Sequence, residues 1–123
     1  MEKIITLLML LASLNFFGQE EILQNKEYNS LDEALKNPGM VYKLNLSNQN
    51  LKLQDIDWSK FVNIEYLNLK NDHLKEIPSG ISTLKTLKVI DLSGNDFNKL
   101  PVEFSNLTRL EEVILNDEKN IDL

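Results

Sequence analysis

Two stretches of the chain, EYLNLKNDHLKEIP at residues 65–78 and KVIDLSGNDFNKLP at residues 88–101, have the same outline although few of their residues are identical. Each begins with apolar residues that alternate with polar ones, continues through Asn and Asp, and ends with an aliphatic residue followed by Pro. Alternation with a period of two is typical of a strand with one buried face. The shared outline therefore predicts a unit of one strand and one return segment that the chain repeats.

The unit recurs with a period of 23 residues, in frames that start at residues 41, 64, 87 and 110. Apolar residues occupy frame positions 1, 4, 6 and 11, except that the last frame stops matching after position 6: Val41, Leu44, Leu46, Leu51; Ile64, Leu67, Leu69, Leu74; Leu87, Ile90, Leu92, Phe97; and Leu110, Val113, Leu115. One such unit cannot bury its own apolar side, whereas stacked copies cover one another. The period predicts stacked coils with one continuous core, at residues 41–63, 64–86, 87–109 and, as a partial copy, 110–123.

The pattern of these frames, LxxLxLxxNxLxxLPxxhxxLxxL, resembles leucine-rich repeats of the 23-residue kind found in Ras-suppressor-type proteins and their bacterial relatives. The resemblance covers residues 41–123, and residues 29–51 also resemble the entry segment of small secreted bacterial leucine-rich repeat proteins. It implies an α/β-type leucine-rich repeat solenoid. Such a solenoid has a short parallel sheet on its concave face, loops and 3-10 turns on its convex face, and an N-terminal capping helix.

A cap is expected over residues 19–40, before the first repeat. Ser30 and Glu33 form a capping box, in which each side chain satisfies a backbone N–H group at the start of a helix. The helix is predicted over residues 30–36, because Asn37-Pro38-Gly39 stops it. We expect it to lie over the open edge of the first repeat. The other end of the solenoid has only NDEKNIDL after Leu115, so the last strand is expected to stay partly bare or to be covered by a partner.

The turn after each strand differs from the family pattern. Frame position 9, where the family has an Asn that satisfies backbone groups, holds Gln49, Asp72, Asn95 and Glu118. Asp72 is expected to accept hydrogen bonds from backbone N–H groups as Asn does, whereas Glu118 is not. Two frames then place Pro on the convex side, which favours extended or 3-10 backbone. The first frame has no Pro there, and its segment DIDWSKF (residues 55–61) is predicted to form a short helix.

Residues 1–18 read as a signal peptide, with Lys3, an apolar run and the small residue Gly18 before an acidic pair. The uncharged run from Ile4 to Gln19 is shorter than the roughly 20 residues that cross a bilayer. Membrane contact is therefore expected only if the segment stays uncleaved as an anchor; a buried helix is the third reading. The expected location is secreted or periplasmic.

The composition argues against several functions. The formal charge of the 123-residue chain is −6 and its pI is near 4.8, which disfavours nucleic acid because basic patches supply affinity for phosphates. Cysteine is absent and His73 is the single histidine, so one chain cannot form a thiolate metal site or a two-histidine metal site. His73 falls at a turn and is expected to be exposed. We predict no catalytic residues, no metal, no cofactor and no enzymatic activity.

The concave face, defined as the strand residues that project away from the core, is the candidate site. Repeat proteins use this surface for binding, and here the partner would be a protein or peptide. The predicted contact residues are Tyr42, Lys43, Asn45, Glu65, Tyr66, Asn68, Lys88, Val89, Asp91, Glu112 and Ile114. Tyr42, Tyr66 and Val89 are expected to be neighbours on adjacent strands, and Asn45, Asn68 and Asp91 to hydrogen-bond the partner's backbone. The alternative is that these residues only keep the sheet soluble, with the molecule acting as a structural element or truncated array that self-associates through its C-terminal edge.

Overall fold

The computed structural model describes residues 18, 21–100 and 102–116, without the side chain of Glu103. The predicted signal peptide lies outside these residues except for Gly18, and so does Glu118. Residues 21–25 are helical. In the part of the chain that the structure describes, no helix combines the length and the apolar character that a bilayer crossing requires.

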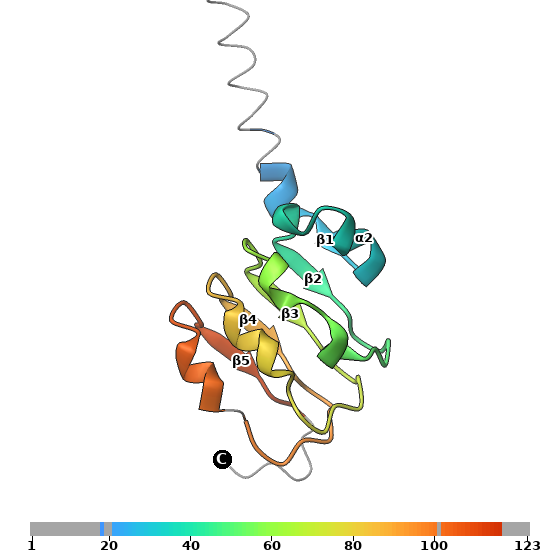
Figure 1. Cartoon of the computed structure of the whole chain (residues 1–123), viewed down its shortest axis with the longest axis vertical. Coiled ribbons are helices and arrows are strands. Elements are labelled where there is room, and N and C mark those ends of the chain that lie inside the picture. The colour runs from blue at the N-terminus through green and yellow to red at the C-terminus, as the bar shows by residue number, and fades with distance from the viewer. Residues whose placement is uncertain (1–17, 19–20, 101, 117–123) are drawn as a thin grey trace, which may run out of the picture.

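Five short parallel strands form one sheet in sequence order, as Figure 1 shows. They are β1 (Glu27–Tyr28), β2 (Lys43–Asn45), β3 (Tyr66–Asn68), β4 (Val89–Asp91) and β5 (Glu112–Ile114). The last four strands keep the 23-residue period in their pairing, so that Leu44, Leu67, Ile90 and Val113 are consecutive partners. The predicted parallel sheet of a leucine-rich repeat solenoid is confirmed.

The return segments form a second layer of 3-10 turns beside the sheet (Figure 1). These turns are η1 (Pro38–Met40), η2 (Leu53–Asp55), η3 (Trp58–Lys60), η4 (Ser79–Thr83) and η5 (Val102–Asn106). Pro78, with φ −56°, directly precedes η4, as expected for a residue whose ring restricts the backbone. The prediction for DIDWSKF was wrong in detail, because the segment contains the end of η2 and the whole of η3 rather than one helix through Ile56.

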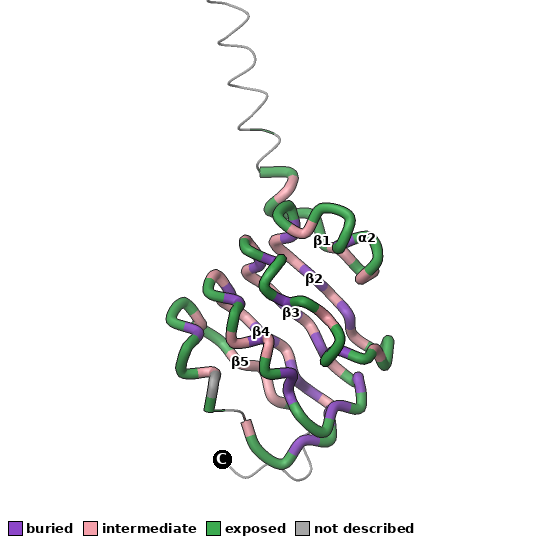
Figure 2. The backbone as a smooth tube through the Cα atoms, in the orientation of Figure 1, coloured by how far each residue is buried: buried purple, intermediate pink, exposed green. Residues whose placement is uncertain are grey.

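The core lies between the two layers and runs through all the complete repeats. Buried residues alternate with partly exposed residues along the inner strands (Figure 2). Leu44, Leu67 and Ile90 have no exposed surface at all. From the convex layer, Trp58 and Phe61 contribute the bulk that Ile81 and Leu84 supply in the next repeat. Each aliphatic side chain buried in this way stabilises the fold by about 1.5–3 kcal/mol.

The N-terminal edge of the sheet is covered by a strand that the sequence did not predict. β1 pairs with β2, with Glu27 opposite Lys43 and Tyr28 opposite Leu44. The predicted helix is present as α2 (Leu31–Lys36), and it packs beside β1. The expectation that this helix itself closes the edge of the first repeat is therefore corrected, since main-chain hydrogen bonds from β1 close it.

Half of the predicted capping box is present in α2. The backbone N–H of Glu33 donates to the Ser30 Oγ at 3.4 Å. The Glu33 carboxylate instead accepts a hydrogen bond from the Lys36 ammonium at 2.7 Å, one turn further along the exposed face. The ion pair with a lysine one turn away holds the Glu33 side chain away from the backbone N–H of Ser30, which it would contact in a complete capping box.

The last repeat is less well covered than the others. Leu110, Val113 and Leu115 are only partly buried, whereas the residues at the same frame positions in the first three repeats have no exposed surface. Each repeat normally covers the apolar side of the one before it. Among the described residues, nothing supplies that cover beyond β5 to the same extent.

Candidate functional site

The concave face is built from two rows of strand residues that flank the buried central residue. One row runs across the five strands as Glu27, Lys43, Tyr66, Val89 and Glu112. The second row runs across the last four strands as Asn45, Asn68, Asp91 and Ile114. Neighbouring strands lie about 4.8 Å apart, so consecutive members of a row can contact one another or a shared ligand.

Tyr42 is not a member of either row, which corrects the predicted grouping of Tyr42 with Tyr66 and Val89. Lys43 is the partner of Tyr66, and Tyr42 precedes the strand. The carbonyl of Tyr42 accepts hydrogen bonds from the N–H groups of Glu65 and Tyr66 at 2.8 and 3.0 Å. Its backbone thus joins the first two repeats, and the aromatic pair expected across these strands does not form. Counting 23 residues from Lys43 leads to Tyr66, so the period already contained this register.

A groove of about 400 Å³ crosses the concave face. Tyr66 and Val89, which are partners in the sheet, are its two uncharged lining residues. Charged residues line the rest: Glu27 in β1, Lys43 in β2, and Glu65, Lys88 and Glu111, each directly before one of the last three strands. The predicted contact residues Lys43, Glu65, Tyr66, Lys88 and Val89 therefore come together. Glu27 and Glu111 were missed: Glu111 follows from the 23-residue period, whereas Glu27 belongs to a strand outside it.

The charges in the groove are partly neutralised within the protein. Lys88 Nζ lies 3.2 Å from Glu65 Oε1. Burial raises the pKa of the Tyr66 hydroxyl, and the charges of Asp91 and Glu27 act in the same direction, while hydrogen bonding with Asn68 acts against them. The phenol therefore stays protonated at neutral pH.

Three residues of the second row also stabilise the turns that follow their strands, a role that was not predicted from the sequence. Asn45 Oδ1 accepts from the Ser47 N–H at 3.1 Å. Asn68 and Asp91 do the same two residues ahead, from Lys70 at 2.9 Å and Ser93 at 3.0 Å. These Asx turns bend the chain away from the strand. For Asn45, Asn68 and Asp91, at least one side-chain oxygen is therefore engaged within the chain, and only the remaining polar atoms can meet a partner.

The turns beyond the strands are held by frame position 9. Asp72 Oδ1 accepts from the N–H groups of Gln49 and Asn50 at 2.8 and 3.1 Å, as predicted. Asn95 accepts in the same way from Asp72 and Leu74, and its Nδ2 also donates to two backbone carbonyls. The side chain of Asp72 has no N–H group to donate, and its Oδ2 is buried without a hydrogen-bond partner among the described residues.

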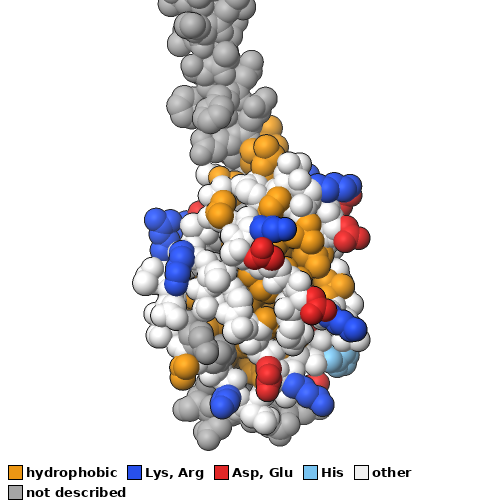
Figure 3. Space-filling model, in the orientation of Figure 1, with side chains coloured by type: hydrophobic (Ala, Val, Ile, Leu, Met, Phe, Trp, Pro, Cys, Tyr) orange, Lys and Arg blue, Asp and Glu red, His pale blue; other side chains and the backbone are white. Residues whose placement is uncertain are grey.

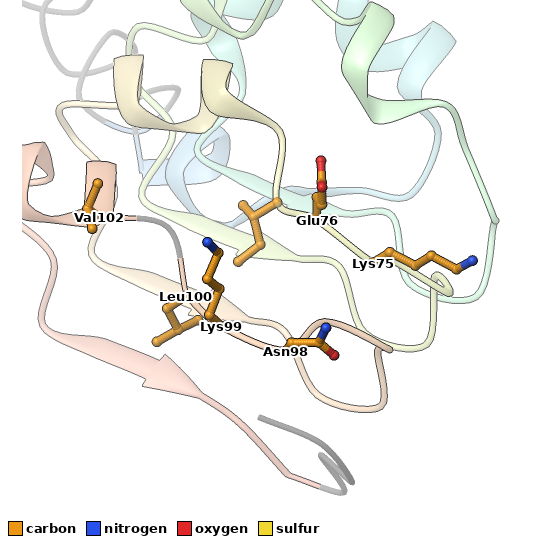
Figure 4. A pocket seen from close by; sticks show the side chains of 7 residues that line it. Lys75, Glu76, Asn98, Lys99, Leu100 and Val102 are labelled. Carbon is orange, nitrogen blue, oxygen red and sulfur yellow. The ribbon is translucent and has the colours of Figure 1, made fainter. Parts of the chain in front are cut away.

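A second hollow, of about 360 Å³, lies between the segments that lead into η4 and η5. It is lined by Lys75, Glu76, Ile77, Asn98, Lys99, Leu100 and Val102. Figure 4 shows that the labelled side chains spread in different directions and do not converge on a common point. A site that binds a small molecule normally places a few polar groups toward one ligand, so this hollow is a weaker candidate than the groove on the concave face.

Within the described ranges, no three His, Asp or Glu side chains are grouped as metal ligands. His73 is exposed, as predicted, and its Nδ1 lies 3.8 Å from Asp96 Oδ2 at the surface. On the face that Figure 3 displays, lysine and acidic side chains are interspersed and do not form a patch of one sign. The same view also shows hydrophobic side chains between these charged groups.

Comparisons with known proteins agree with the geometry. The family model described as "Leucine rich repeat" matches residues 62–119. Among solved structures, a leucine-rich repeat protein of Leptospira interrogans is similar with 25% sequence identity and a TM-score of 0.54. The match covers 80% of this chain but 31% of that chain. No curated protein matches the sequence significantly. Leucine-rich repeat folds generally mediate contacts between proteins and are typically non-enzymatic.

Proposed function

Because this chain is a leucine-rich repeat protein, we propose that it is a non-catalytic module that binds a protein or peptide on its concave face. The observation that carries the proposal is the groove across the strands, in whose otherwise charged lining Tyr66 and Val89 are neighbours. The partly buried aromatic ring is rigid and amphipathic, which is typical of residues that contribute most to binding. The sheet holds Tyr66 and Val89 on adjacent paired strands, and both side chains remain open to a partner in the groove.

The proposal is tested by site-specific photo-crosslinking followed by affinity measurement. A photoreactive benzoylphenylalanine placed at Val89 is expected to crosslink the partner, whereas the same residue at Lys60, on the convex layer, is not. The crosslinked protein is then purified. Tyr66→Ala is expected to weaken its binding at least about tenfold, the usual loss at an interface hot spot.

Tyr42→Ala is the matched control, since it removes the same kind of side chain one residue outside the row. Its affinity is expected to stay within about twofold of the wild type. Both variants must keep the wild-type circular dichroism spectrum and melting behaviour. Equal affinity of wild type and Tyr66→Ala for a partner crosslinked from Val89 would remove the groove as the binding site.

A second candidate function is association through the end of the solenoid. It is favoured by the partial exposure of Val113 in β5 and of Leu110 and Leu115 on either side of that strand, because exposed strand edges and apolar ends invite pairing with another chain. Sedimentation velocity tests this function. The expected result is a concentration-dependent oligomer that Ile114→Lys reduces to a monomer; a strict monomer at high concentration eliminates the function.

Export of the protein is also a proposal, supported by the apolar N-terminal segment. Intact-mass measurement of protein recovered from outside the cytoplasm is expected to show loss of residues 1–18. A mass that includes the whole segment contradicts cleavage at this position.

A further inference from the structure

The β4–β5 end of the concave face has a pattern of side chains that the proposed function does not require. Val89 and Asp91 project from β4 on either side of buried Ile90, and Glu112 and Ile114 project from β5 on either side of Val113. The register pairs Val89 with Glu112 and Asp91 with Ile114. The two carboxylates therefore occupy one diagonal of a four-residue square, and the two aliphatic side chains occupy the other.

The dimensions of this square follow from sheet geometry. Adjacent strands are about 4.8 Å apart, and residues two apart on one strand are separated by about 6.6 Å. The backbone positions of Asp91 and Glu112 are then about 8 Å apart. Two flexible carboxylate side chains at this separation can both reach one cation placed between them.

The negative charge at this end is not neutralised by the neighbouring cation. Lys88 is engaged with Glu65 at 3.2 Å. Among the described residues, Asp91, Glu111 and Glu112 take part in no ion pair within 4.0 Å. Glu111 and Glu112 are exposed, and Asp91 Oδ1 is the atom that holds its own turn. This leaves the second oxygen of Asp91 and both glutamates for a cation from outside.

We infer that the partner inserts an arginine or lysine side chain from an extended segment into this square. The aliphatic stem would lie against Val89 and Ile114, and the charged end would lie between Asp91 and Glu112. Long basic side chains bury their stems on apolar surface while their charged ends stay among polar groups. The planar guanidinium can also bind carboxylates with two parallel hydrogen bonds, so arginine fits the square best. This inference rests on the proposed function and narrows the partner to a basic one.

The inference is tested with a defined peptide, acetyl-Ser-Leu-Arg-Leu-Ser-amide, and the same peptide in which neutral citrulline replaces arginine. Both are titrated into 15N-labelled protein at low salt while amide NMR shifts are followed. The arginine peptide is expected to shift the amides of residues 89–92 and 111–115. The citrulline peptide is expected to bind up to about 25-fold more weakly, because it loses both ion pairs and each exposed ion pair contributes up to about fivefold.

Asp91→Asn and Glu112→Gln identify the two carboxylates. Each is expected to weaken the arginine peptide about fivefold without affecting the citrulline peptide. Asn holds the same turn at Asn45 and Asn68, so Asp91→Asn is expected to keep the fold. Glu76→Gln, on the rim of the other hollow, makes the same change in net charge and is expected to bind as the wild type does.

Two outcomes contradict the inference while leaving the proposed function intact. One is equal binding of the arginine and citrulline peptides, and the other is equal loss of affinity in all three variants, including Glu76→Gln. Absence of any shift at β4 and β5 also overturns it. The proposed function fails separately, if Tyr66→Ala leaves the crosslinked partner's affinity unchanged.

Discussion

At the scale of single residues, the turns depend on side chains that tolerate left-handed backbone. Asn48, Asn71 and Gly94 occupy the same frame position and have φ values of 61°, 55° and 65°. Asn and Gly adopt this region at lower cost than other residues. His73 also has left-handed backbone, with φ 55°. Its place in the turn is therefore explained by its backbone conformation, without a catalytic role.

Asp72 satisfies fewer buried backbone groups than Asn95, which occupies the same frame position one repeat later. Burial raises the pKa of its carboxyl, while the N–H groups of Gln49 and Asn50 and the charge of His73 lower it less. One repeat later, Asn95 donates to the carbonyls of Leu69 and Leu92 from the position equivalent to Asp72 Oδ2. An ionised carboxylate oxygen cannot donate to the equivalent carbonyls, so burial in the folded state disfavours the ionised form more than water does in the unfolded state.

We therefore expect Asp72→Asn to raise the free energy of unfolding by about 1–3 kcal/mol at neutral pH. Because the folded pKa is the higher one, the folded state binds more protons than the unfolded state between the two pKa values. The stability of the wild type then falls as pH rises through the raised pKa. The gain from Asp72→Asn should accordingly shrink as the pH is lowered from above the raised pKa of Asp72 to the ordinary carboxyl pKa, and should change no further below that. Urea unfolding at several pH values measures this.

The neighbouring surface carboxyl provides the control for Asp72. Asp96 is exposed, so Asp96→Asn is expected to change stability by no more than about 0.5 kcal/mol at any of these pH values. A pH-independent effect of Asp72→Asn, or a loss of stability at neutral pH, would show that the Asp72 carboxylate is well accommodated.

At the scale of elements, the 3-10 turns η3 and η4 pack against each other through the ring of Trp58. Trp58 in η3 is buried, and its Nε1–H donates to the carbonyl of Leu53 at 3.1 Å. Gly80 in η4 lies against this ring, so that a Cβ at Gly80 would come 2.8 Å from Trp58 Cδ1. The ring is fixed by its hydrogen bond and by the core, and the glycine makes room for it.

Gly80→Ala is expected to lower the free energy of unfolding by about 1–3 kcal/mol, the usual cost of overpacking. Alanine is otherwise favoured over glycine in helical backbone, so a net loss can be assigned to contact with Trp58. Thermal unfolding followed by tryptophan fluorescence reports both the stability and the environment of the ring.

Gly39→Ala serves as the comparison, because a Cβ at Gly39 meets no atom within 4 Å. This variant is expected to unfold within about 0.5 kcal/mol of the wild type. Equal stability of Gly80→Ala and Gly39→Ala would mean that η3 and η4 move apart without cost.

At the scale of the whole molecule, the core is continuous but its two ends differ. β1 and α2 cover the first repeat, whereas the residues beside β5 remain partly exposed. In a solenoid each repeat is stabilised by its own packing and by its neighbours. The contribution of a given frame position to stability should therefore depend on where its repeat lies in the stack.

Leu87 and Leu110 test this dependence, since both are leucine at frame position 1. Leu87 has no exposed surface and Leu110 is partly buried. Leu87→Ala is expected to cost about 3 kcal/mol, within the range for a buried leucine, and Leu110→Ala roughly half of that or less. Urea unfolding of both variants is the measurement. Equal losses would indicate that the end beside β5 is covered in solution, and sedimentation would show whether a second copy covers it.

Much of the fold and part of the site could be predicted from the sequence. The 23-residue period marks the strands β2 to β5 and the buried column of Leu44, Leu67 and Ile90, because stacked repeats write the same burial pattern in each copy. The period also determines which residues share a row, including Lys43 with Tyr66. The role of Asp72 as an acceptor followed from its chemistry and from its frame position.

The tertiary structure decided what lies outside the period. β1 pairs with β2 although Glu27 and Lys43 are not one repeat apart, so no internal similarity points to it. Its docking closes the N-terminal edge and adds Glu27 to the groove. The groove itself, the Asp72 oxygen that has no partner among the described residues, and the contact of Gly80 with Trp58 depend on atoms from different repeats. A repeating pattern specifies which side chains face the core, but only packing in three dimensions determines the spaces between them.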